Sequence, residues 1–175
     1  TAQLHRTLLY ASVRGVFLGN GSLDFAQVIS GTPLGSSVYA ASSGAFSIAS
    51  GRLAYALGLH GPCISYDTAC SSGLVATHAA VRSLQRDESV TGLAMGVNIM
   101  LTPSASITLA ISGMTSALGR CHTFDNRADG YARAESCCGA ACAREEDDVS
   151  SRVSGCLVRQ DGRSASLTAP NGSAQ

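Results

Sequence analysis

The stretch of sequence that decides the fold is CISYDTACSSGLVATHAAVRSL, which occupies residues 63–84. Residues 63–66 predict a short strand, and the apolar positions between 74 and 84 predict a helix that is apolar nearly all round. A helix of that kind is usually buried at the centre of a fold. The polar residues 67–72 lie between the two elements. The segment therefore predicts a strand, a tight turn and a buried helix, with Cys70 in the turn.

Cys70 occupies a position at which a thiol can act as a nucleophile. A thiol at the start of a helix faces free backbone N–H groups and the positive end of the helix dipole, which favour the thiolate form. The same N–H groups can stabilise an oxyanion on a thioester carbonyl. Ser71 and Ser72 are candidate helix caps. The residues alone leave a second interpretation open, in which Cys70 is one more buried cysteine like Cys63, because spacing identifies no catalytic base.

The composition predicts one compact domain. Of the 175 residues, 45% are hydrophobic and 14% are charged, which excludes a disordered chain. The formal net charge is zero, and no run of arginines with interleaved aromatic residues suggests a nucleic-acid surface. No apolar run is long enough to span a membrane. The seven cysteines are irregularly spaced, so we expect a reducing compartment: the cytoplasm, or a plastid if a targeting segment precedes Thr1.

Alternating strand and helix signals predict a layered α/β fold. The expected strands are 13–18, 63–66, 93–100, 139–143 and 153–158, and the expected helices are 23–29, 43–57, 74–84 and 104–112. Residues 121–135 are polar and irregular, and a loop of that length inside a compact domain is often functional. Cys137, Cys138 and Cys142 lack a second pair of ligands, so we expect no metal site.

The run Tyr66-Asp67-Thr68-Ala69-Cys70-Ser71-Ser72-Gly73-Leu74 resembles the active-site block of β-ketoacyl synthases, especially the ketosynthase domains of modular polyketide synthases. Other motifs are similar to blocks of that family in the same order: Gly15-Val16-Phe17-Leu18-Gly19, Ser47-Ile48-Ala49-Ser50-Gly51-Arg52-Leu53-Ala54-Tyr55, Gly119-Arg120-Cys121-His122-Thr123-Phe124-Asp125, Ala128-Asp129-Gly130-Tyr131, Gln160-Asp161-Gly162-Arg163 and Leu167-Thr168-Ala169-Pro170-Asn171-Gly172. The resemblance covers residues 14–175 and implies that residues 1–175 are a β-ketoacyl synthase N-terminal region.

The resemblance implies a thiolase-like fold with two βαβαβαββ halves in five layers. This chain would hold the N-terminal half and the start of the second half. It also implies a homodimer, with the strand before the nucleophile at the interface. Cys70 would accept an acyl group from the phosphopantetheine thiol of an acyl carrier protein. Malonyl-carrier protein would then lose CO₂ and attack that thioester, in fatty acid or polyketide biosynthesis. No cofactor bound by the chain itself is implied.

The chain departs from the family pattern in two ways. The family uses two further histidines, which lie downstream of the Pro170-Asn171-Gly172 block. None of the histidines here, His5, His60, His78 and His122, lies in such a motif, and His122 stands where the family usually has lysine. We therefore expect the chain alone not to condense substrates. Residues 133–139 also lack two glycines of the matching family block.

Two other functions remain open from the sequence. One is a thiolase-like acyltransferase that uses coenzyme A thioesters, which the blocks at residues 121–131 and 168–172 disfavour. The other is a non-catalytic scaffold or partner subunit that pairs with an active synthase. Retention of Cys70 disfavours the scaffold, whereas the missing histidines and glycines favour it.

Overall fold

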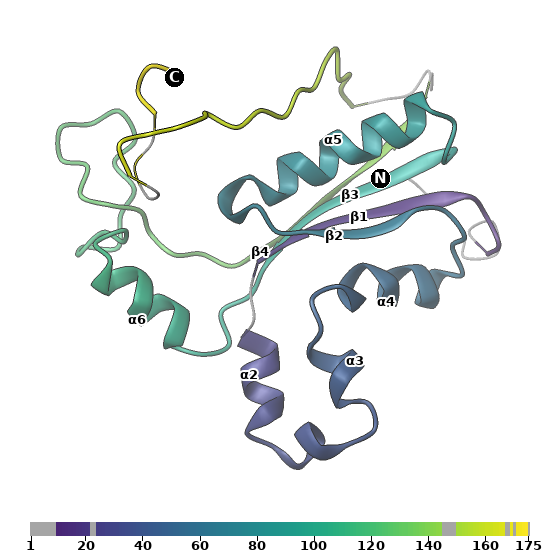
Figure 1. Ribbon diagram of the computed structural model, residues 1–175, viewed down its shortest axis with the longest axis horizontal. Helices are drawn as coiled ribbons and strands as arrows, with labels where there is room; N and C mark the ends of the chain where they lie inside the picture. The colour runs from purple at the N-terminus through teal and green to yellow at the C-terminus, as the bar shows by residue number, and fades with distance from the viewer. Residues whose placement is uncertain (1–9, 22–23, 145–149, 167–168, 170, 175) are drawn as a thin grey trace.

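The computed structural model describes residues 10–21, 24–144, 150–166, 169 and 171–174. Its elements are β1 (Arg14–Asn20), α2 (Asp24–Ser30), η1 (Pro33–Ser36), α3 (Ala40–Gly44), α4 (Ile48–Leu57), β2 (Cys63–Tyr66), η2 (Ala69–Ser71), α5 (Ser72–Gln85), β3 (Thr91–Asn98), α6 (Ser104–Ile111) and β4 (Ser136–Ala143). Figure 1 shows α5 on one face of the four-stranded sheet and α4 on the other. The predicted layered α/β arrangement is confirmed. In the described ranges, no helix combines the length and apolar character needed to cross a membrane.

The sheet has the strand order β2-β1-β3-β4. β1 pairs in parallel with β2 and with β3, and β4 pairs antiparallel with β3. Val16, Phe17 and Leu18 of β1 are buried, as expected for a central parallel strand that is covered on both faces. Because β1, β2 and β3 run in the same direction, their carboxyl ends meet at one edge of the sheet. Open α/β sheets commonly place their functional sites at that edge.

Helix α5 packs closely on the sheet because small residues face each other across the contact. Phe17 of β1 forms the core with Ala76 and Ala80 of α5 and with Ala94 of β3. Gly92 lies directly under Ala80, and a Cβ atom at Gly92 would be 3.1 Å from the Cβ of Ala80. Small residues on both sides of this contact thus let α5 pack closely on β1 and β3.

A pair of serines joins α4 to the opposite face of the sheet. The Ser65 hydroxyl on β2 donates to the Ser50 hydroxyl at 3.0 Å and accepts the Ser50 backbone N–H at 3.3 Å. Ser50 lies in the first turn of α4, where backbone N–H groups have no partner within the helix. The Ser65 side chain therefore satisfies the helix terminus and fixes α4 on β2.

One predicted helix is divided in the structure. Residues 43–57 do not form a single helix: α3 ends at Gly44, Ala45 is extended with φ −72° and ψ 126°, and α4 begins at Ile48. The apolar spacing across the break is helical, but the chain turns there so that α4 can lie under the sheet. Gly44 already weakened the helix signal in the sequence.

The strand predicted at residues 153–158 is wrong, because residues 151–164 have no regular structure. A strand needs a hydrogen-bonded neighbour, and within the described residues none pairs with this segment. The prediction that α5 is buried all round is also wrong for this chain. Its sheet-facing side is buried, but Leu74 on the outer side is 74% exposed.

Candidate active site

Cys70 lies in the connection from β2 to α5, at the carboxyl-end edge of the parallel strands. It is the middle residue of the 3-10 turn η2, which runs directly into α5 at Ser72. The Cys70 side chain is exposed. The predicted strand, turn and helix are therefore present around Cys70, with the thiol one short turn ahead of the α-helix.

A set of short side-chain hydrogen bonds holds this connection. The Asp67 carboxylate accepts the Ala69 backbone N–H at 3.0 Å. The Ser72 hydroxyl accepts the Thr68 backbone N–H at 2.8 Å and donates to the Ala69 carbonyl at 2.7 Å. The Ser71 hydroxyl donates to the Thr68 carbonyl at 2.9 Å. Each bond links a residue after Cys70, or Asp67 before it, to the backbone of Thr68 or Ala69.

Ala69 has a backbone conformation that an L-residue rarely adopts. Its φ angle is +54°. Left-handed backbone costs a non-glycine residue about 1–2 kcal/mol and persists only where the surrounding structure enforces it. The hydrogen bonds to Thr68 and Ala69 supply that enforcement, so the orientation of the next residue, Cys70, depends on them.

The predicted capping roles of Ser71 and Ser72 are wrong. Ser71 is the N-cap residue of α5, but its side chain makes no capping hydrogen bond, and the Ser72 hydroxyl bonds backward to Thr68 and Ala69. The preceding 3-10 turn brings the backbone of Thr68 and Ala69 within hydrogen-bond distance of both hydroxyls. The backbone N–H groups of Ser71 and Ser72 already donate to the carbonyls of Thr68 and Ala69. Both hydroxyls are therefore available to shape the turn around Cys70.

Gly19 of the central strand β1 allows the start of α5 to pack directly on the sheet. An added Cβ at Gly19 would lie 2.5 Å from the Ser72 carbonyl carbon and 2.6 Å from the Gly73 nitrogen. Gly73 in turn lies against Gly96 of β3. The start of α5 thus rests on the backbone of β1 and β3, and the Cys70 turn sits directly above the ends of these strands.

None of the other cysteines forms a disulfide bond with Cys70 within the described structure. The interpretation of Cys63 as a buried cysteine is wrong: Cys63, Cys121, Cys137 and Cys138 are exposed, and Cys142 and Cys156 are half-buried. Both Cys137 and Cys138 lie on β4, an outer strand of the described sheet. Burial against the core raises the pKa of the Cys142 thiol, which makes Cys142 a poor nucleophile.

The described histidines are placed on separate elements. His60 is exposed in the link before β2, and His122 lies in the loop after α6. His78 lies on α5, half-buried, and its Nδ1 atom has no hydrogen-bond partner among the described residues. His5 falls outside the described residues. No described hydrogen bond joins a histidine side chain to the Cys70 turn.

The long loop after α6 has its own internal order. Thr115 pairs with Tyr131 across it, and the buried Ser116 hydroxyl accepts the backbone N–H groups of Leu118 and Arg120 at 3.3 Å each. Gly130 has φ +137° and packs on the backbone of Ser116, where a Cβ would lie 2.5 Å from the nitrogen. The described part of the loop is therefore a folded segment.

An ion pair near the tip of this loop gives a testable pH dependence. Hydrogen bonds from the Arg127 side chain, and then from its backbone N–H, lower the pKa of Asp125. Because the ionised carboxylate is the bonded form, the local order from this pair is present above the ordinary aspartate pKa. That order is lost as pH falls through the lowered pKa.

We expect Arg127→Gln to raise the pKa of Asp125, as measured by NMR titration of its carboxyl carbon. Arg120→Gln in the same loop should leave it unchanged, and an equal response to both changes would contradict the assignment.

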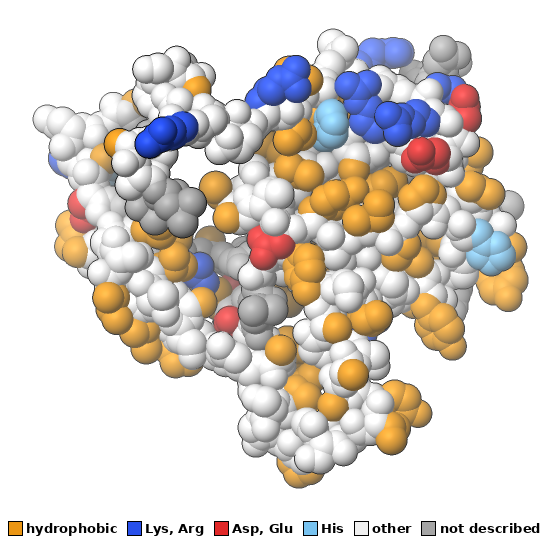
Figure 2. Space-filling view, viewed as in Figure 1, with side chains coloured by type: hydrophobic (Ala, Val, Ile, Leu, Met, Phe, Trp, Pro, Cys, Tyr) orange, Lys and Arg blue, Asp and Glu red, His pale blue; other side chains and the backbone are white. Residues whose placement is uncertain are grey.

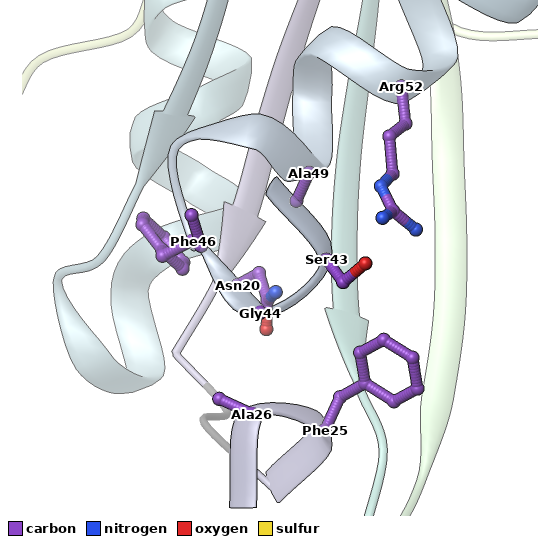
Figure 3. Close-up of a pocket in the computed structure, with 9 residues that line it drawn as sticks. Asn20, Phe25, Ala26, Ser43, Gly44, Phe46, Ala49 and Arg52 are labelled. Carbon is purple, nitrogen blue, oxygen red and sulfur yellow. The ribbon is translucent and has the colours of Figure 1, made fainter. Parts of the chain in front are cut away.

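A pocket of about 150 Å³ lies under the carboxyl end of β1. Figure 3 shows it between Asn20 at the end of β1, Phe25 of α2 and Arg52 of α4, with Phe46 at its side. The Arg52 guanidinium donates to the Ser42 carbonyl at 3.4 Å. None of the lining residues belongs to the Cys70 turn. The pocket is therefore separate from the Cys70 turn.

The family model described as "Beta-ketoacyl synthase, N-terminal domain" matches residues 2–148. The chain belongs to this family. It is 40% identical over 173 residues to a mycocerosic acid synthase-like polyketide synthase of Mycolicibacterium smegmatis, covering 95% of this chain and 8% of that protein. It is 43% identical over 176 residues to an erythronolide synthase of Saccharopolyspora erythraea, covering 95% of this chain and 6% of that protein.

Solved structures agree with the sequence relatives. The ketosynthase from module 6 of the bacillaene synthase of Bacillus subtilis 168 superposes with a TM-score of 0.79 at 32% identity, over 97% of this chain and 30% of that one. An oxazolomycin ketosynthase domain of Streptomyces albus gives 0.64 at 30% identity, over 78% of this chain and 24% of that one. The predicted thiolase-like α/β fold is therefore confirmed. The chain spans only a small part of these synthases and less than a third of each ketosynthase structure.

Proposed function

We propose that this chain is the nucleophile-bearing part of a ketosynthase domain of a polyketide or fatty acid synthase. The complete domain would catalyse decarboxylative Claisen condensation of acyl and malonyl thioesters. The observation that carries the proposal is the exposed Cys70 thiol, which lies in a hydrogen-bonded turn at the carboxyl ends of β1 and β2. Family membership supports the reaction class, and the run from Tyr66 to Leu74 supports the choice of Cys70.

The first half-reaction is transfer of the acyl group to Cys70. The Cys70 thiolate attacks the carbonyl carbon of the acyl thioester and forms a tetrahedral oxyanion. The N–H groups of Ser71 and Ser72 already donate to Thr68 and Ala69, so we assign stabilisation of that oxyanion to other backbone N–H groups around Cys70. The intermediate collapses by breaking the bond to the phosphopantetheine sulfur, which leaves as a thiolate and takes up a proton. Cys70 then holds the acyl group as a thioester.

The second half-reaction forms the carbon–carbon bond. A malonyl thioester loses CO₂, and the resulting carbanion equivalent attacks the Cys70 thioester carbonyl. The bond to the Cys70 sulfur breaks, which releases the β-ketoacyl thioester and regenerates the thiolate. We assign the two histidines of this step to the part of the domain beyond the motifs found here. The chain alone should therefore accept an acyl group without condensing it.

The partners follow from the same reaction. An acyl carrier protein would deliver both substrates on its phosphopantetheine arm, and the cytoplasm would keep Cys70 reduced. We also propose a homodimer that forms along β2, since β2 is an outer strand of the described sheet and Ile64 on it is exposed. Figure 2 shows exposed apolar side chains over the lobe of α2, η1 and α3, and Leu34, Val38 and Tyr39 of this segment are exposed. A second copy of the chain could cover this apolar surface.

Mass spectrometry after incubation with an acyl thioester of phosphopantetheine tests the nucleophile. We expect one acyl group on Cys70, and we expect Cys70→Ala to reduce total acylation about tenfold or more. Cys121→Ala removes another exposed thiol and serves as the matched control, because it should leave acylation unchanged. A wild-type chain without an adduct at Cys70 would instead favour the non-catalytic scaffold. Equal acylation by carrier-bound and coenzyme A thioesters would favour the thiolase-like acyltransferase.

A further inference from the structure

We propose that Ser72 is a positioning residue for Cys70: its hydroxyl holds the strained backbone at Ala69 and thereby fixes the direction of the thiol. The inference rests on the proposed function, because it assigns Ser72 a part in preparing the acyl-accepting nucleophile. It concerns a residue that does not itself touch the substrate. Its basis is the hydrogen-bond geometry of the turn.

The Ser72 hydroxyl bonds to the backbone on both sides of the Ala69 φ rotation. It accepts the Thr68 N–H at 2.8 Å and donates to the Ala69 carbonyl at 2.7 Å. Rotation about φ of Ala69 moves these two backbone groups relative to each other. One hydroxyl that binds both therefore resists that rotation directly.

Ser72 itself is held deep in the fold. It is 5% exposed, and its backbone lies on Gly19 of β1, where no side chain separates the helix from the strand. Thr68 and Ala69 are exposed, and the two hydrogen bonds that join them to Ser72 are part-buried. The Ser72 hydroxyl is therefore a fixed point that holds an otherwise exposed turn, and loss of the hydroxyl should free the turn to move.

The strain at Ala69 gives the turn a direction in which to relax. With φ at +54°, Ala69 would move toward an ordinary negative φ once the restraint is gone. Cys70 follows immediately, so this movement turns the thiol away from the start of α5. The favourable environment of the helix terminus extends only over its first turn. A small rotation is therefore enough to lower the reactivity of Cys70.

Neighbouring hydroxyls are less suited to this role. Ser71 is half-buried, and among the described residues its hydroxyl bonds only to Thr68, through the carbonyl at 2.9 Å and the hydroxyl at 2.8 Å. Ser83 is as well buried as Ser72, at 2% exposed, but it pairs with the Ser89 hydroxyl toward the far end of α5. Ser83 is therefore a matched control: its removal deletes a buried hydrogen bond from the same helix without touching the turn.

The test measures the alkylation rate of Cys70 by iodoacetamide in the 175-residue chain. Cys63 and Cys70 both lie between Arg52 and Arg82, so one tryptic peptide carries both and Cys63 is the internal reference. Ser72→Ala should lower the Cys70-to-Cys63 rate ratio about fivefold, and Ser83→Ala should leave it unchanged. An unchanged ratio in Ser72→Ala, or an equal fall in both variants, would overturn the proposal.

A second substitution separates positioning from a general loss of stability. Glycine accepts positive φ without strain, so Ala69→Gly should recover part of the ratio when it is combined with Ser72→Ala. Additive losses in that double variant would count against the proposal. If Ser72→Ala alone loses its folded circular dichroism signal, recovery of that signal in the double variant supports the proposal and continued unfolding overturns it. Alkylation needs no thioester, so absence of an acyl adduct would refute the proposed function while leaving this result intact.

Discussion

Replacing Gly19 with valine should reduce the free energy of unfolding by about 3 kcal/mol, close to the upper range for overpacking a core. The cause is the contact between β1 and the start of α5. A Cβ at Gly19 would lie 2.5 Å from the Ser72 carbonyl carbon, and the atoms that it meets are backbone atoms, which cannot rotate away as a side chain does. Valine adds two methyl groups at the same place. The helix must lift off the strand or the strand must bend.

Urea denaturation followed by circular dichroism measures this loss. Gly51→Ala is the matched control, because an added Cβ at Gly51 in α4 meets no atom within 4 Å. Alanine is the better helix former there and should raise stability by about 0.5–1 kcal/mol. A destabilised Gly51→Ala with a tolerated Gly19→Val would contradict this account of the packing. The Gly19 variant should also slow alkylation of Cys70, since lifting α5 moves the turn.

The parts of the fold that the sequence predicted well are those with strong local signals. Residues 63–66 form β2 as expected, and the apolar run after Cys70 forms α5. These segments are bounded by Gly61-Pro62 on one side and by the polar turn on the other. The apolar pattern and the turn residues therefore predict the same element boundaries. The family motifs pointed to the same turn, and the structure places Cys70 there on the surface.

The parts that could not be predicted depend on distant contacts. The segment 153–158 has a strand-like composition, but a strand forms only with a neighbour, and composition does not reveal whether one is present. The break after Gly44 depends on how α4 reaches the sheet. The outer face of α5 is apolar in sequence yet exposed at Leu74, because burial depends on what covers it.

The detailed geometry of the site was also hidden from the sequence. Alanine is a poor indicator of positive φ, so nothing in the letters marked Ala69 as strained. Ser72 carries a cap signal by residue type, but its hydroxyl bonds to the backbone of Thr68 and Ala69 and not to an N–H group of the helix. Only the structure shows that the Ser72 hydroxyl bonds to Thr68 and Ala69, which precede it in the chain. The sequence thus pointed to Cys70 as the nucleophile, whereas the hydrogen bonds that hold its turn could be found only in the structure.

Replacing Asp24 with asparagine should reduce the free energy of unfolding by about 2 kcal/mol, within the range for losing hydrogen bonds to a buried charged group. Asp24 is 4% exposed at the start of α2. One of its carboxylate oxygens accepts the backbone N–H groups of Leu101 at 2.9 Å and Thr102 at 3.1 Å. These groups lie 77 and 78 residues further along the chain, so this carboxylate ties the lobe of α2 to the segment between β3 and α6.

Asparagine has the same shape but loses the charge, and one of its two terminal positions becomes a donor. If the amide group faces Leu101 and Thr102, three donors meet with no acceptor; if the carbonyl faces them, the bonds persist without the charge that strengthens them. The negative charge at the start of α2 is lost in either case, although such charges stabilise helix N-termini. Unfolding in urea measures the change, and proteolysis should reach residues 99–112 faster in the variant.

Asp87→Asn is the matched control for Asp24→Asn. The Asp87 carboxylate also accepts a short hydrogen bond, from Arg144 at 2.6 Å, but the side chain is 79% exposed. Exposed ion pairs contribute only about 0–1 kcal/mol, and asparagine tolerates the positive φ of +58° at this position. The same chemical change should therefore cost little at Asp87 and much at Asp24. Equal losses at the two sites would show that charge, and not the buried connection from α2 to residues 101 and 102, determines the effect.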